Sequence, residues 1–220
     1  MNFLQSFGGK KILMALSGLL MLMFLLAHML GNLAFHLGPE AINSYARHLQ
    51  DLWPLLWSQR IFLILVLILH VWLGISLSLE NYNAGTAKYA VRKYQQANPA
   101  SRSMIYTGLV ILGFVIYHLL HFTFRVTNPE IYQFTDQAGH LDVYRMAGLG
   151  FASPFVVLLY LGAMVAVLLH VWHGLGSLLQ TMGWNSAFYH PLVEKGSNTV
   201  AVVLFLGFIS IPITFLLFGL

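Results

Sequence analysis

The sequence contains no cysteine, which excludes disulfides, thiolate metal sites, iron–sulfur clusters and a cysteine nucleophile. Charged residues are also scarce, at 8% of the 220 residues against about a quarter in soluble domains, while 58% are apolar. This composition excludes a disordered chain and argues against a water-soluble globule. The net charge of +4 comes from basic residues scattered over the loops, which form no patch for nucleic acid.

Long charge-free segments separate the few charged residues, for example between Lys11 and Glu40 and between Arg145 and Glu194. A helix needs about 20 apolar residues to cross the hydrocarbon core of a bilayer. We therefore predict an all-α integral membrane bundle, a single domain over residues 1–220 with five transmembrane helices. The predicted spans are 12–34, 60–79, 104–125, 151–179 and 198–219, and no acidic residue lies inside them.

The loops predict the topology. All lysines fall on the side of the N-terminus, and most acidic residues fall on the other side. The positive-inside rule then places the N-terminus in the cytoplasm and the C-terminus outside. The membrane we expect is the inner (cytoplasmic) membrane of the cell. The basic loop from Asn81 to Ser101 would face a soluble partner on that side. Helical spacing between Pro39 and Trp53 predicts a short surface helix on the outer side.

Histidine is the most informative residue type, with ten in the chain. Those in loops or at the interface fit ordinary surface positions; they are His36, His48, His140 and His190. The others lie inside the predicted spans; they are His28, His70, His118, His121, His170 and His173. An ionisable side chain at membrane depth is costly, so this second set predicts a functional site.

The depths of these histidines predict what they hold. At a rise of 1.5 Å per residue, His28 and His118 lie about 22–25 Å from the cytoplasmic ends of their spans, and His70 and His170 about 14 Å. Two levels about 10 Å apart result, each with histidines from two helices. Two haems b stacked across the bilayer need this arrangement, because each iron takes one imidazole from each of two facing helices.

A short repeat supports the haem interpretation. The segment His70-Val71-Trp72-Leu73-Gly74 resembles His170-Val171-Trp172-His173-Gly174, and both read His-x-x-x-Gly. A glycine one turn after a histidine lies on the same helix face and lets a flat macrocycle approach the backbone. The repeat favours His170 over His173 as the ligand. It does not distinguish His118 from His121.

Several motifs together resemble those of a known family. They are Gly9-Lys10-Lys11-Ile12-Leu13-Met14-Ala15-Leu16-Ser17-Gly18, His28-Met29-Leu30-Gly31-Asn32-Leu33, His70 with Gly74, His118-Leu119, His170 with Gly174, and Gln180-Thr181-Met182-Gly183-Trp184. Over essentially its whole length, the chain resembles the membrane-anchor subunit of succinate dehydrogenases and fumarate reductases. The form it resembles is the dihaem cytochrome b that folds as one polypeptide of five helices.

This resemblance implies a role for four of the histidines. His28 and His118 would be the axial ligands of a distal haem, and His70 and His170 those of a proximal haem. The implied partners are a flavoprotein and an iron–sulfur subunit. The chain itself would not act on succinate; it would pass electrons to a quinone, commonly menaquinone, and contribute the quinone site. Some fumarate reductases of this type carry a glutamate for proton transfer where this chain has Leu168.

The quinone site is less clear from the sequence. A quinone head group needs a proton source at the membrane edge near the distal haem, and Asp51 on the outer side is the carboxylate we expect there. Arg125, which follows the distal ligand by about two turns, is placed to pair with a haem propionate.

Two alternatives remain. One is a dihaem cytochrome b that anchors a hydrogenase or a formate dehydrogenase, but such anchors place their histidines differently. The other is a haem-free transporter, which predicts acidic or amide residues in the spans and helices broken at mid-membrane. Pro154 and Pro212 lie near a span end or in a plain apolar helix and do not build such a site.

Overall fold

The computed structural model describes residues 6–84, 99–184, 186 and 188–219. Its elements in chain order are α1 (Phe7–Asn32), η2 (Leu33–Leu37), α2 (Pro39–Asp51), α3 (Trp53–Ala84), α4 (Pro99–His118), η3 (Leu119–Thr123), η4 (Pro129–Tyr132), α5 (Val143–Gly150), α6 (Pro154–Thr181) and α7 (His190–Phe218). An isolated bridge between Thr135 and Leu141 is the extent of β-structure in this part of the chain. The predicted all-α fold is confirmed.

Within the described residues, five helices are long and apolar enough to cross a membrane, which makes the chain a multi-pass membrane protein. These spans are Phe7–Leu37, Trp53–Asn83, Ser103–Thr123, Pro154–Thr181 and His190–Phe218. Large apolar side chains on them point outward, such as Leu65 at 61% exposure and Ile68 at 60%. Lipid is the solvent that suits such a surface.

Two of these helices extend beyond the predicted spans by seven residues or more at one end. The α3 helix has 32 residues, about 48 Å at 1.5 Å per residue, and α7 begins at His190 rather than near residue 198. The expectation that no acidic residue lies inside a span is therefore wrong for Glu80 and Glu194. Both acids lie near helix ends, where a helix longer than the hydrocarbon core reaches the head groups.

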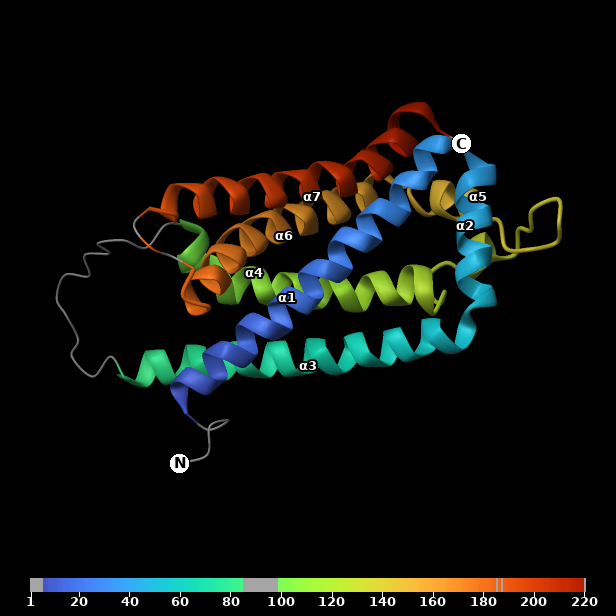
Figure 1. The fold of residues 1–220 in the computed structure, drawn as a ribbon. Coiled ribbons are helices and arrows are strands. Elements are labelled where there is room, and N and C mark those ends of the chain that lie inside the picture. The colour runs from blue at the N-terminus through green and yellow to red at the C-terminus, as the bar shows by residue number, and fades with distance from the viewer. Residues whose placement is uncertain (1–5, 85–98, 185, 187, 220) are drawn as a thin grey trace.

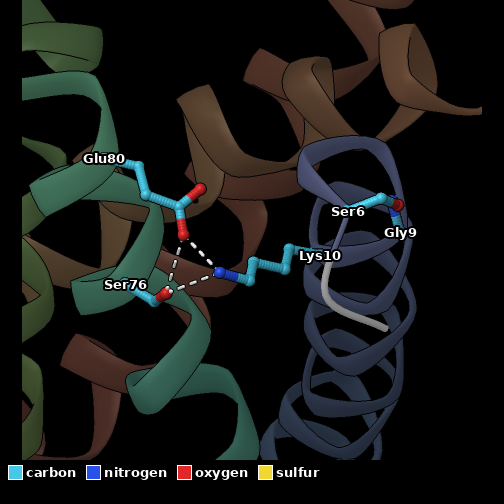
Figure 2. A network of polar contacts seen from close by, with 5 residues as sticks. All are labelled: Ser6, Gly9, Lys10, Ser76 and Glu80. Atoms are coloured by element: carbon cyan, nitrogen blue, oxygen red, sulfur yellow. Dashed lines mark hydrogen bonds and ion pairs between the residues drawn. The ribbon is translucent and has the colours of Figure 1, made fainter. Parts of the chain in front are cut away.

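The acid in α3 has a partner on α1 (Figure 2). Glu80 forms an ion pair with Lys10, whose Nζ also donates to Ser76 Oγ at 3.3 Å. Ser76 Oγ in turn donates to Glu80 Oε1 at 3.3 Å. This network joins the first turn of α1 to the last turns of α3.

The helices form one bundle in which α1 crosses the others obliquely (Figure 1). The start of α1 packs on α3 and its end on α6 and α7, while α6 lies between α4 and α7. The apolar core is concentrated on α6. Val157, Tyr160 and Phe215 belong to one buried cluster, and Met164 and Val167 to a second.

A pair of short helices covers one end of the bundle (Figure 1). The predicted surface helix is present as α2, which begins with Pro39 in its first turn and buries Ile42 and Asn43. The sequence did not predict α5. Asp142 is the N-cap of this helix, and its Oδ1 accepts from the Arg145 N–H at 3.0 Å. Asn43 joins the two helices, because its Nδ2 donates to Asp142 Oδ1 at 3.0 Å and its Oδ1 accepts from the Tyr144 N–H at 3.1 Å.

Candidate functional site

Two of the histidines within the spans meet between α3 and α6. The ring centres of His70 and His170 lie 6.3 Å apart, with an interplanar angle of 61°. Each Nδ1 has a hydroxyl partner on a neighbouring helix: Ser17 Oγ on α1 lies 3.1 Å from Nδ1 of His70, and Thr107 Oγ1 on α4 lies 3.1 Å from Nδ1 of His170. Nε2 is therefore the nitrogen that each ring has left for a ligand. We call these two rings the His70–His170 pair.

A second pair lies between α1 and α4, nearer the end covered by α2 and α5. The ring centres of His28 and His118 are 6.0 Å apart, with an interplanar angle of 79°. The Tyr160 hydroxyl lies 3.2 Å from Nδ1 of His118. His28 differs from the other three rings, because its Nε2 lies 3.3 Å from the Asn32 amide nitrogen one turn on. We call these two rings the His28–His118 pair.

The structure separates His118 from its neighbour His121, which spacing alone did not. His121 is 1% exposed and stacks on Phe122 with ring centres 4.0 Å apart, away from His28. Its Nδ1 lies 3.1 Å from the same Tyr160 hydroxyl that approaches His118. His121 is thus a buried neighbour of the His28–His118 pair rather than a member of it.

A π-helical turn, η3, carries His121 at the end of α4. The Tyr132 hydroxyl donates to the carbonyl of His121 within this turn. A phenol is protonated at neutral pH and can donate, and burial raises the pKa of Tyr132 further. π-helical turns are rare and are frequently found at functional sites.

The two pairs lie at different levels of the bundle. On α1, Ser17 contacts His70 and His28 contacts His118; on α4, Thr107 contacts His170. Eleven residues separate the two levels on both helices, which is about 16 Å along a helix axis. The levels are thus farther apart along the helices than the separation of about 10 Å expected from the span ends.

The glycines of the His-x-x-x-Gly repeat have methionine neighbours. A Cβ built on Gly74 would lie 3.4 Å from Met14 Cε, and one built on Gly174 would lie 4.0 Å from Met104 Cε. Other glycines face the imidazoles: a Cβ built on Gly18 would lie 3.4 Å from Cε1 of His70, and one built on Gly108 would lie 3.4 Å from Cε1 of His170.

The two residues predicted for the quinone and propionate roles are both exposed and lie outside the histidine pairs. Asp51 is the last residue of α2, at the end of the bundle nearer the His28–His118 pair. Arg125 follows the π-helical turn with a φ of 60°, and its guanidinium lies 5.9 Å from the centre of the Tyr132 ring. The predicted docking loop from Asn81 to Ser101 lies largely outside the described residues.

Comparisons with models of known protein families, with curated proteins and with solved structures found no match.

The donor set and its spacing are compatible with haem. Two imidazoles on one iron each place Nε2 about 2 Å from the metal, and the ring centre lies about 1.2 Å beyond Nε2, so the two centres should be about 6.4 Å apart. Both observed separations, 6.0 and 6.3 Å, agree with this value. In the described part of the chain no three His, Asp or Glu side chains converge on one point. Each pair supplies two nitrogens, the number an iron needs above and below a macrocycle.

The two pairs differ in how ready they are to bind iron. In the His70–His170 pair both Nδ1 atoms have hydroxyl partners, an arrangement typical of metal-bound histidines. In the His28–His118 pair, the Asn32 amide must turn away before Nε2 of His28 can bind a metal. The sequence did not identify Ser17, Thr107 or Tyr160. A repeated Met-x-x-[Ser/Thr]-Gly before His28 and before His118 would have indicated the first two.

Proposed function

We propose that this chain is the cytochrome b membrane anchor of a succinate:quinone oxidoreductase, in the inner membrane of the cell with its N-terminus in the cytoplasm. The observation that carries the proposal is that four imidazoles on four helices form two facing pairs. The ring centres are 6.0 Å apart in the His28–His118 pair and 6.3 Å apart in the His70–His170 pair. The motifs that resemble dihaem anchors contain the same four histidines.

The four histidines would hold two haems b, His70 and His170 the proximal one, and His28 and His118 the distal one. Such haems supply one-electron transfer between an iron–sulfur subunit and a quinone. The protein contributes the rest: it fixes the imidazoles on four helices, surrounds them with apolar side chains and keeps water from the centres. The chain does not itself act on succinate.

The partners are assigned from the two ends of the bundle. Lys10, Lys11 and Lys195 lie at the end nearer the His70–His170 pair, where a flavoprotein and an iron–sulfur subunit would dock. A quinone, menaquinone being the commonest for this form, would react at the opposite end. The α2–α5 cover and Asp51 lie there, and membrane lipid would surround the spans.

Asp51 is the residue we propose for the quinone site, with Arg125 as a propionate partner. Asp51 is the last residue of α2. Its side chain is exposed beside Trp53, at the edge of the span that follows. A carboxylate in this place can exchange protons with water and reach a head group in the membrane.

Asp51→Asn should slow quinone turnover while both haems stay bound and remain reducible from the succinate side. The expected loss is about 100-fold, the low end of what a positioned acid or base contributes. Quinone reductase activity of the complex measures it. Glu40→Gln is the matched control, because Glu40 is exposed in the first turn of the same helix. Equal rates for the two variants would remove Asp51 from the site.

Haem content tests the proposal as a whole. The purified chain should contain two haems b, non-covalently bound because the sequence has no cysteine. A pyridine haemochrome assay gives the number per chain, and a reduced-minus-oxidised spectrum gives the haem type. A haem-free chain would favour the transporter alternative. Two haems that succinate cannot reduce in the isolated complex would favour the hydrogenase or formate dehydrogenase anchor.

A further inference from the structure

Two buried hydroxyls contact the His70–His170 pair from helices that carry the other pair. Ser17, on the helix of His28, is 3% exposed, and Thr107, on the helix of His118, is 7% exposed. Each oxygen lies 3.1 Å from the Nδ1 of its histidine. Each hydroxyl also lies near a carbonyl of its own helix: Ser17 Oγ is 3.0 Å from the Met14 oxygen, and Thr107 Oγ1 is 3.1 Å from those of Ser103 and Met104.

Counting protons assigns the tautomer of both rings. A hydroxyl has one hydrogen to donate and lone pairs with which to accept. If the hydroxyl donates to the carbonyl and accepts from Nδ1–H, both contacts become hydrogen bonds. If it donates to a bare Nδ1 instead, the carbonyl contact is lost. Buried polar groups favour the arrangement with more bonds satisfied, which leaves Nε2 of His70 and His170 unprotonated.

The arrangement occurs twice, on α1 and on α4. Met14 and Ser17-Gly18 precede His28 by the same spacing with which Met104 and Thr107-Gly108 precede His118. In both copies the glycine faces an imidazole of the His70–His170 pair, because a Cβ built on Gly18 or on Gly108 would lie 3.4 Å from Cε1 of His70 or His170, respectively. The residue is serine in one copy (Ser17) and threonine in the other (Thr107), and the two side chains share a hydroxyl group. Its recurrence at the same place relative to two histidines indicates that the hydroxyl is required there.

We propose that Ser17 and Thr107 are positioning residues that hold His70 and His170 as Nδ1–H tautomers and set the redox potential of the metal centre between them. This inference rests on the proposed function. An acceptor on Nδ1–H raises the basicity of Nε2, and a more basic axial ligand favours the oxidised iron. The two hydroxyls therefore lower the midpoint potential of this centre and leave the His28–His118 centre unaffected.

The test is a potentiometric titration of the full chain, comparing wild type with Ser17→Ala and with Thr107→Val. Each variant should shift one of the two midpoint potentials upward and leave the other in place. The conservative changes Ser17→Thr and Thr107→Ser keep a hydroxyl and should restore the wild-type value. Low-temperature EPR of the oxidised protein gives a second readout, because the signal of one low-spin centre should change when its ring loses the hydroxyl partner.

The control variant is Thr214→Val on α7. Thr214 Oγ1 donates to the Ser210 carbonyl at 2.8 Å, the same kind of helix contact, and this threonine is not part of either pair. It should leave both potentials unchanged.

Failure of the proposed function and failure of this inference give different results. A haem-free wild type would overturn the proposed function and the inference with it.

Two haems whose potentials are the same in wild type, Ser17→Ala and Thr107→Val would overturn the inference alone. If Ser17→Ala loses one haem and Ser17→Thr keeps it, the positioning role is supported. If Ser17→Ala and Ser17→Thr each lose both haems, Ser17 is needed for folding and not for positioning the imidazole, and the inference is wrong.

Discussion

His170→Ala should leave the chain with one haem in place of two, whereas His173→Ala should keep both. The ring that faces His70, with centres 6.3 Å apart, is that of His170. The remaining centre lies between α1 and α4 and shares no histidine with the lost one, so it should survive. His70→Ala should give the same single haem as His170→Ala, because an iron with one protein ligand is held weakly.

Pyridine haemochrome content per chain, with potentiometry to identify the haem that stays, measures this result. The His173→Ala variant is the matched control, because it changes the same residue type on the same helix. The pairing would be wrong if His70→Ala and His170→Ala removed different haems. A single haem in His173→Ala, with two retained in His170→Ala, would give the ligand role to His173. Because an empty haem site destabilises the folded state, every variant is compared at equal protein content.

His118→Ala should remove the other haem, and His121→Ala should retain both haems in a less stable protein. His118 faces His28 at 6.0 Å, whereas the buried ring of His121 stacks on Phe122 at 4.0 Å. Truncating His121 leaves a cavity beside Tyr160 and Phe122, and cavities in a packed core destabilise it. Haem content and thermal unfolding of the two variants, measured side by side, separate a ligand from a packing residue.

The opposite pattern of haem loss would assign the ligand role to His121. If His121→Ala lost a haem and His118→Ala kept two, the ligand would be the residue on the π-helical turn, and the assignment at this level would be wrong. Asn32→Ala adds a check on the same centre. Removing the amide that lies 3.3 Å from Nε2 of His28 should not reduce haem content, since the amide competes with the iron for that nitrogen.

Hydropathy predicted the five spans, but it placed several of their ends wrongly. Charge-free runs locate the part of a helix inside hydrocarbon, and they end at the first charged residue. A helix itself continues as long as its backbone bonds and its end charges find partners, as Glu80 does with Lys10. The same reasoning missed α5, because its eight residues bury their apolar side against α2, distant in sequence.

That the histidines fall at two levels could be predicted because helix rise converts residue number into depth, but the separation of the levels along the helices was underestimated. The hydroxyl partners could not be, since Ser17 and His70 are 53 residues apart in sequence and meet only through the packing of α1 on α3. Serine and threonine are also ordinary in membrane helices, where they bond to their own backbone. The carbonyl of His121 in the π-helical turn accepts from Tyr132, eleven residues further on, and no local sequence pattern marks this contact.

Helices α1 and α4 each contact both histidine pairs, and this fixes the number of residues between the two contacts on each helix. α1 carries Ser17 for one level and His28 for the other, and α4 carries Thr107 and His118 in the same way. Each residue in a helix adds about 100° of rotation, so an inserted or deleted residue between the two would turn one of them off the shared face. Apolar side chains in these intervals can therefore be exchanged for one another, while the number of residues between the hydroxyl and the histidine has to be maintained in both helices.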